Sequence, residues 1–271
     1  MTRTFFADEL DTAASWWRIY RTDGVALAFS THDRDLWFDG LTHRAAPGLL
    51  PSAIRRTNDL ADDEAEVRGA LSHDTITEAD IRSGRFDGAR IEMGIVDWST
   101  LEREVLYAGT IAAVSHDAGG FSAHLRSAKA DLDVDMVPRT SPSCRARFCG
   151  PGCNLPPIRF TRRFTVTGVD HEAGSIIIPA GLTGSYVHGE ARWIDGPHAG
   201  QTMGILDING STLTLDRTLV PKTAAGLRIE LREGCDKTIG TCAARFDNAR
   251  NFQGEPHLPG NDLLAQYPQP R

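Results

Sequence analysis

Apolar and polar residues alternate over short stretches along most of the chain, and Gly, Pro or Asp residues separate these stretches. Alternation with a period of two is typical of β-strands that bury one face. The pattern therefore predicts two series of strands. The first series covers residues 15–21, 25–33, 35–45, 52–57, 65–71, 89–98, 103–116 and 121–128. The second series covers residues 162–170, 175–180, 191–196, 201–208, 211–216 and 227–234.

Local signals add turns and a short helix to this pattern. Residues 76–84 predict a short helix, with Thr77 as its N-cap and Gly84 as its stop. Two glycines at 119–120 lie between predicted strands and indicate a hairpin, and Asn209–Gly210 is a candidate type I′ hairpin turn.

The strand pattern breaks between Val137 and Pro157, where Pro and Gly residues exclude long regular elements. We place a domain boundary here. The predicted fold class is mainly β, with one domain at residues 1–137 and a second at residues 138–271. Within the second domain, residues 160–232 predict a compact β module, bracketed by the segments 144–153 and 235–260.

Composition and charge restrict the classes of function. The 271 residues are 41% hydrophobic and 24% charged, as in ordinary globular proteins, and the net charge of −7 argues against a general nucleic-acid binder. The sequence contains no run of eighteen apolar residues, so no membrane span is predicted. The N-terminus lacks the apolar block of a signal peptide. We therefore expect synthesis in the cytosol, where thiols stay reduced.

The five cysteines bracket the β module. Cys144, Cys149 and Cys153 come just before it, and Cys235 and Cys242 come just after it. If the ends of the module meet, four thiolates can gather at one centre. Disulfides are disfavoured in the cytosol, and the C-x2-C spacing of common zinc sites is absent. An iron–sulfur cluster needs four thiolates from looser loops. The spacing alone leaves an iron–sulfur cluster and zinc both open.

Several blocks of sequence resemble one known family. They are THDRDL at 31–36, ITEADIRSGRFDGARIEMGIVDW at 76–98, AGTIAAV at 108–114, CRARF at 144–148 and GCDKTIGTCAARFDNARNFQGEPHLPG at 234–260. In these blocks the chain resembles the tail-tip (baseplate) hub proteins of siphophages and gene transfer agents, which are related in role to the lambda tail-tip protein.

The resemblance implies a structural protein of the virion or gene-transfer-agent tail tip, made in the bacterial cytoplasm. Its N-terminal domain would be a β-barrel-type ring in a homotrimer. The trimer would adapt the tail tube and its distal tail protein to a central fibre or tip attachment protein. The lumen of the ring would pass DNA or a tape-measure protein.

The resemblance also implies a [4Fe–4S] cluster held by Cys144, Cys153, Cys235 and Cys242. Members of the family that resemble the lambda protein have one cysteine pair with eight residues between its members and one with six. The same spacings occur here, which leaves Cys149 as the spare thiol. Zinc is the alternative metal.

Residues beside the second cysteine pair admit more than one interpretation. Thr241 predicts the start of a short helix that carries Cys242. Phe246 and Phe252 either shield the cluster from water or pack locally, and the sequence does not separate the two.

Other polar residues favour structural roles. His32, Asp33 and Asp35 resemble a catalytic trio, but Asp side chains commonly cap turns, so a polar turn between two strands is the better hypothesis. His188 and His198 lack nearby carboxylates or thiols in the sequence, which favours surface or hairpin positions. Common hydrolase, zinc-protease and nucleotide-binding motifs are absent, so we expect no enzyme. The alternatives are an iron–sulfur oxidoreductase and a zinc-stapled binding module.

Overall fold

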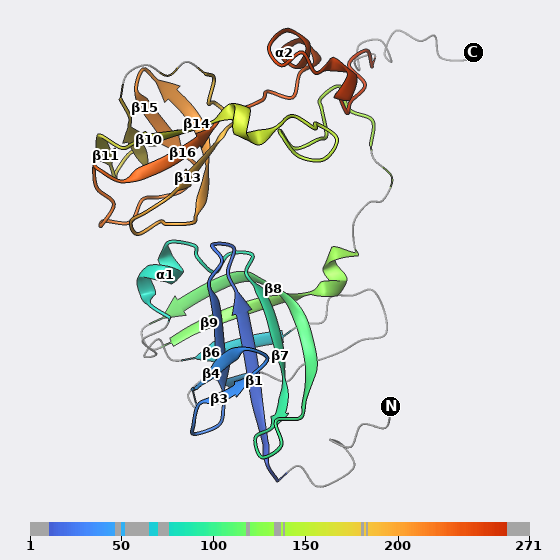
Figure 1. Ribbon diagram of the computed structural model, residues 1–271, viewed down its shortest axis with the longest axis vertical. Helices are drawn as coiled ribbons and strands as arrows, with labels where there is room; N and C mark the ends of the chain where they lie inside the picture. The colour runs from blue at the N-terminus through green and yellow to red at the C-terminus, as the bar shows by residue number, and fades with distance from the viewer. Residues whose placement is uncertain are drawn as a thin grey trace, which may run out of the picture. The chain divides into compact units, whose positions relative to one another are not determined.

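The computed structural model describes residues 11–46, 50–51, 65–69, 76–117, 120–132, 137, 139–179, 182 and 184–258. The chain divides into two compact units, Met1–Asp135 and Met136–Arg271 (Figure 1). Strands dominate both units, so the predicted mainly β fold class is confirmed. The predicted strand at 52–57 lies outside the described residues. No helix in the described ranges is long and apolar enough to cross a membrane.

The first unit is one sheet in the order β3-β4-β2-β1-β7-β8-β9-β6-β5. Its strands are β1 (Ala13–Tyr20), β2 (Ala26–Ser30), β3 (Leu36–Phe38), β4 (Leu41–Ala45), β5 (Leu50–Pro51), β6 (Ala65–Gly69), β7 (Arg90–Asp97), β8 (Arg103–Asp117) and β9 (Gly120–Ser127). Register shifts lie between Met93 and Gly94 and between Ile111 and Ala113. Such bulges bend and twist a sheet, and the sheet curls into a half-barrel (Figure 1).

Strand β1 is buried on both faces. Trp17 packs in the main core of the half-barrel, whereas Trp16 packs on the opposite face with Leu36 and Phe38. Gly94 lies opposite Trp16 in β7, where an added Cβ would lie 2.7 Å from the Trp16 ring and 2.0 Å from the carbonyl of Glu104. Glycine at 94 is therefore what lets this indole lie against the sheet.

The β3–β4 hairpin covers the outer face of β1. The sequence pattern predicted residues 35–45 as one strand, which is wrong, because the chain reverses at Asp39 and Gly40. Both residues have positive φ, at 52° and 73°, as a type I′ turn requires. The Asp-Gly pair at 39–40 was the signal for this turn.

Two further local predictions are confirmed in the first unit. Helix α1 (Glu78–Arg82) begins after Thr77, whose side chain accepts a hydrogen bond from the backbone N–H of Asp80, and Gly84 follows it with φ of 68°. Strands β8 and β9 form the hairpin expected at 119–120. The 3₁₀ helix η2 (Ala128–Asp131) ends the regular structure of the unit.

The second unit contains the predicted β module. Its strands are β10 (Thr161–Thr165), β11 (Gly168–Asp170), β12 (Ser175–Ile177), β13 (Glu190–Trp193), β14 (Thr202–Asn209), β15 (Thr212–Leu215) and β16 (Arg228–Arg232). The described residues of this unit also form three short helices: η3 (Pro157–Phe160) directly before β10, and α2 (Ile239–Ala244) and η4 (Ala249–Asn251) after β16.

The module closes on itself as a small antiparallel barrel. Strands β10 and β11 are nearly continuous and lie at the two ends of the order β10-β16-β13-β14-β15-β12-β11. Between them the N–H of Val166 bonds to the carbonyl of Leu227 beside β16, and the N–H of Thr167 bonds to the carbonyl of Ile177 in β12. The chain thus changes partner within one extended segment, and closure removes the free edges.

The hairpin at Asn209–Gly210 is confirmed, but its turn differs from the predicted type I′. Asn209 pairs with Thr212, so Gly210 and Ser211 form the loop. Gly210 has φ of 60°, whereas Ser211 is outside the left-handed region, a combination that fits type II′.

Candidate functional site

Four of the five cysteines line one pocket in the second unit. The residues lining it are Cys144, Ala146, Phe148, Cys153, Leu155, Cys235, Lys237, Thr238, Cys242, Phe246, Asn248, Asn251 and Phe252. We call this the thiol pocket. All five cysteines are free thiols, and Cys149 is the one that does not line it.

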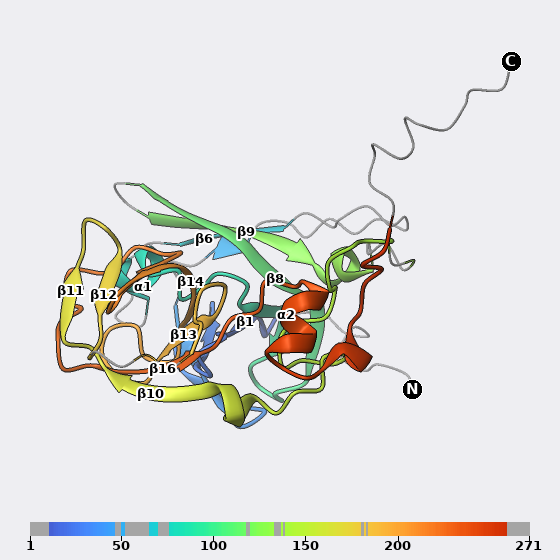
Figure 2. The same ribbon diagram turned by 90° about the horizontal axis from the view of Figure 1, so that it is seen from above.

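Barrel closure brings the two cysteine segments together. Thr161, the first residue of β10, pairs with Arg232, the last residue of β16, and the N–H of Glu233 bonds to the carbonyl of Phe160 at 2.9 Å. The chain enters and leaves the barrel at the same place, as the sequence argument required. In Figures 1 and 2 the segment before β10 runs beside α2.

Direct bonds then join the two segments at the pocket. The N–H of Cys144 bonds to the carbonyl of Lys237 at 2.9 Å, and the Lys237 ammonium donates back to the carbonyl of Ala146. These contacts place the residues beside Cys144 against the residues beside Cys235.

A carboxylate fixes the turn that separates the second cysteine pair. Asp236 accepts hydrogen bonds from the N–H and hydroxyl of Thr238, each at 2.9 Å, and from the Thr241 hydroxyl at 2.7 Å. Thr238 caps α2 by accepting from the N–H of Thr241 at 3.2 Å. The helix therefore begins at Ile239, and the predicted start at Thr241 is wrong because Thr238 supplies the cap.

Aromatic rings form one wall of the pocket. Phe148 lies 4.9 Å from Phe246 and 5.3 Å from Phe160, between ring centroids, and Phe246 is buried. Phe246 and Phe252 both line the pocket, and Phe246 also packs in this ring cluster. Local packing, one of the two predicted alternatives, is confirmed for Phe246, and shielding of a cluster stays a prediction.

Burial sets the protonation of the thiols. It raises the pKa of Cys242, and the neighbouring thiols of Cys235, Cys144 and Cys153 raise it further. Burial likewise raises the pKa of Cys235. For Cys149 burial is again the main cause, and its pKa rises to about 11. These three thiols are therefore protonated at neutral pH, and a metal that binds Cys235 or Cys242 must displace their protons.

The four thiols line one pocket, which bears on metal binding. In the part of the chain that the structure describes, no three His, Cys, Asp or Glu side chains are arranged to hold a single metal ion. The pocket nevertheless has four thiols in its lining, and Cys242 interacts electrostatically with the other three. The four thiols are therefore gathered at one pocket, and metal binding there stays a prediction.

The other polar candidates have structural roles. In the turn between β2 and β3, a carboxylate oxygen of Asp35 accepts from the N–H of Ala45 at 2.8 Å, so the predicted polar turn is confirmed. His188 is exposed, as predicted. His198 occupies the hairpin position, the second predicted alternative, between the paired strands β13 and β14. It is not at the surface, because its ring is fully buried with Nδ1 2.7 Å from Oε1 of Gln201.

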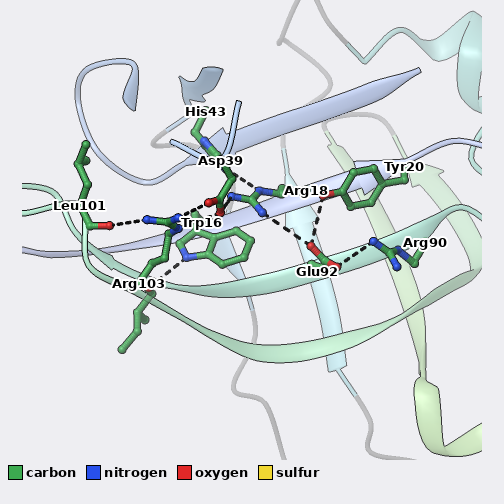
Figure 3. Close-up of polar contacts among 10 residues, drawn as sticks. Trp16, Arg18, Tyr20, Asp39, His43, Arg90, Glu92, Leu101 and Arg103 are labelled. Atoms are coloured by element: carbon green, nitrogen blue, oxygen red, sulfur yellow. Dashed lines mark hydrogen bonds and ion pairs between the residues drawn. The ribbon is translucent and has the colours of Figure 1, made fainter. Parts of the chain in front are cut away.

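A buried polar network on the outer face of β1 was missed by the sequence analysis (Figure 3). Arg18 is 7% exposed, and its guanidinium donates to Asp39 at 2.6 Å and to Nε2 of His43 at 3.0 Å. Arg103 also binds Asp39, and Glu92 lies 3.9 Å from Arg18. The network fastens the β3–β4 hairpin to the sheet.

The pKa values of Asp39 and His43 in this network depend on the neighbouring arginines and on burial. Arg103, followed by Arg18, holds the pKa of Asp39 below its usual range. Burial, helped by Arg18, lowers the pKa of His43 to about 4. His43 is therefore neutral at physiological pH and accepts a hydrogen bond from Arg18. Trp16, Arg18 and Tyr20 occupy every second position of β1 and therefore share one face. This spacing was the sequence signal that could have revealed the network.

Comparisons with known proteins cover both units. Residues 2–156 match the family described as baseplate hub protein, N-terminal attachment domain, and residues 184–262 match phage conserved hypothetical protein BR0599. No curated protein matches the chain.

A chain in the solved structure "Virion of native gene transfer agent (GTA) particle" is similar over 98% of this chain and 96% of its own length. Its sequence identity is 32% and its TM-score is 0.84. The family resemblance and the location in a phage or gene-transfer-agent particle are therefore confirmed. The chain belongs to the baseplate hub protein family.

Proposed function

We propose that this protein forms the homotrimeric hub of a tail tip. In this role it connects the tail tube and a distal tail protein to a central fibre or tip attachment protein. The observation that carries the proposal is the full-length similarity to a chain of a gene-transfer-agent virion, together with the attachment-domain match over residues 2–156. DNA or a tape-measure protein would pass through the lumen of the trimer. The hub role is structural and requires no catalysis.

The thiol pocket supports a second part of the proposal, a structural [4Fe–4S] cluster. The pocket supplies four thiols, which is the number of ligands that such a cluster takes, one for each iron. Phe246 and Phe252 also line the pocket and would limit the access of water to a bound cluster. The donor set and its surroundings therefore fit the cluster, with Cys144, Cys153, Cys235 and Cys242 as ligands.

When bound, the cluster would supply iron–thiolate bonds that cross-link the two segments flanking the barrel. Between Cys153 and Cys235 lie about eighty residues, and a disulfide that closes such a loop is worth roughly 4 kcal/mol on the chain-entropy estimate. The chain's own contacts prepare the site, because Asp236 and Thr238 hold the second cysteine pair in position. Metal binding would then add its free energy to folding.

Metal analysis tests the cluster. Protein purified without oxygen should contain about four irons and four acid-labile sulfides per chain. About one zinc per chain, with no sulfide, would instead support the zinc-stapled module. Turnover with a physiological electron donor would support an oxidoreductase and contradict the structural role.

Particle assembly tests the hub. Deletion of the gene should leave tail tubes without a tip or central fibre, and expression of the intact chain in trans should restore both. A reconstruction of the particle should show three equivalent copies at the tip. Six equivalent copies, or normal tips without the protein, would overturn the proposal.

A further inference from the structure

The segment 248–255, which we call the strap, closes one side of the thiol pocket. Its first residue, Asn248, is 5% exposed, and its Nδ2 donates to the carbonyl of Cys153 at 2.8 Å and lies 3.7 Å from the Cys153 Sγ. Farther along, the main-chain N–H of Gln253 donates to the Sγ of Cys144 at 3.4 Å. Two thiols of the pocket thus receive N–H groups from one short segment.

The Asn248 amide is held in one orientation. Its Oδ1 accepts from Nδ2 of Asn251 at 2.7 Å, while its Nδ2 faces the Cys153 carbonyl. A flipped amide would place oxygen against oxygen and nitrogen against nitrogen, so the hydrogen-bond network itself assigns the two atoms. The N–H group near the Cys153 sulfur is therefore a fixed feature of the site.

Asn248 also connects the two cysteine pairs. Its backbone N–H bonds to the carbonyl of Cys242 at 3.0 Å, whereas its side chain binds Cys153. One residue thereby sets the distance between a ligand that precedes the barrel and a ligand that follows it.

The rest of the strap is fastened to the first cysteine segment. The N–H of Arg145 bonds to the carbonyl of Gln253 at 2.9 Å, and the Arg145 guanidinium binds both carboxylate oxygens of Glu255 at 2.8 and 2.9 Å. On the same side, the N–H of Glu255 bonds to the carbonyl of Ser141, and the N–H of Ser141 donates to a carboxylate oxygen of Glu255, each at 2.8 Å. At Gly254 an added Cβ would lie 2.6 Å from the carbonyl of Ser143, so this close approach requires glycine.

Hydrogen bonds to sulfur change the chemistry of a thiolate ligand. They stabilise negative charge on the sulfur, and in iron–sulfur proteins they are one of the factors that set the reduction potential. Outer residues that orient ligands commonly affect metal affinity by 10–100-fold.

We propose that Asn248, together with the N–H of Gln253, is a positioning residue that holds Cys153 and Cys144 for the cluster and raises its reduction potential. This inference rests on the proposed cluster. Loss of an N–H···S bond should disfavour the more negative, reduced state. A carboxylate at the same place should disfavour it further.

The test compares Asn248→Ala and Asn248→Asp with Gln253→Ala, which keeps its main-chain N–H. We expect the midpoint potential to fall in the order wild type, Asn248→Ala, Asn248→Asp, with roughly tenfold faster loss of iron to a chelator in both Asn248 variants. Gln253→Ala should match the wild type in both measurements. A merely structural role would speed iron loss and leave the potential unchanged.

If the Asn248 variants fail to fold, a measurement on the wild-type protein still tests the inference. Pulsed electron paramagnetic resonance of the reduced cluster, with ¹⁵N supplied in asparagine, should detect a coupled side-chain nitrogen that Asn251→Ala retains. A loaded wild type without that coupling, or Asn248 variants with the wild-type potential, would overturn this inference alone. A wild type that binds no iron or sulfide would overturn the proposed cluster as well.

Discussion

In the first unit, Trp16 and Trp17 bury the two faces of one strand, and apolar side chains fill the space on either side. Around the thiol pocket, order comes instead from hydrogen bonds such as those of Asp236 and Asn248, with one small cluster of Phe rings. The first arrangement is stabilised by burial of apolar surface. The second has little apolar surface to bury, so its stability should depend on what the thiols bind.

The largest expected effect is at the thiols. Substitution of Ala for Cys235, or for any of the other three thiols on the pocket, should abolish metal binding and much of the soluble yield, because each removes one of four ligands. Iron analysis and the yield of soluble protein measure this. Cys149→Ala is the matched control and should keep both near wild-type levels. A fully loaded Cys235→Ala protein would remove this residue from the ligand set.

A second substitution tests the apolar core of the first unit in place of the thiol pocket. Trp17→Ala should lower the free energy of unfolding of the first unit by about 4 kcal/mol, as expected for a large buried side chain. The metal content of the second unit should not change. Denaturation followed by tryptophan fluorescence suits this, since four of the five Trp residues lie in the first unit.

Trp37→Ala is the control for that measurement. Its side chain is 66% exposed, so the free energy of unfolding should stay within about 0.5 kcal/mol of the wild type. Equal losses in the two Trp variants, or loss of iron in Trp17→Ala, would contradict the separation of the two regions.

Acid should act on the first unit through His43. Its pKa is about 4 in the folded protein, against about 6.5 in an unfolded chain. Between these values the unfolded state binds more protons than the folded state. The contribution of His43 to stability is therefore fully present above pH 6.5 and is lost as pH falls towards 4. The expected loss is about 3 kcal/mol.

The His43→Gln variant isolates this contribution. Glutamine can accept the hydrogen bond of Arg18 but does not titrate, so the variant should lose less stability than the wild type between pH 6.5 and 4. Urea denaturation at several pH values measures the difference. Identical pH dependence in the two proteins would show that His43 does not control acid sensitivity.

The comparison also explains which features could be predicted from the sequence. Period-two alternation predicted both strand series, because a strand that buries one face shows apolar residues at every second position of its own sequence. The bracketing of the module by Cys144–Cys153 and Cys235–Cys242 predicted that its ends meet, and the pairing of Thr161 with Arg232 realises this.

Other features depend on partners far away in the sequence. His198 is buried beside Gln201, and Arg18 is buried beside Asp39, a residue that the β3–β4 hairpin brings over the sheet. The role of Asn248 depends on a contact across ninety-five positions. Alternation and spacing do not encode such pairings, so the network and the strap became visible only in the folded chain. The cluster itself stays a prediction.

The smallest expected effect comes from two equivalent helix caps, one in each region. Thr77 caps α1 by accepting from the N–H of Asp80, and Thr238 caps α2 by accepting from the N–H of Thr241. Loss of an N-cap costs about 1 kcal/mol. In Thr77→Ala this should appear as faster local hydrogen exchange in α1, with unchanged iron.

Thr238→Ala should show the same local loss in α2 together with faster release of iron, because its cap lies between two proposed ligands. Hydrogen exchange by mass spectrometry and release of iron to a chelator measure the two effects in the same samples. If neither substitution changes the rate of iron release, then packing and not the metal holds α2 in place. The second region would then be ordered by the same means as the first.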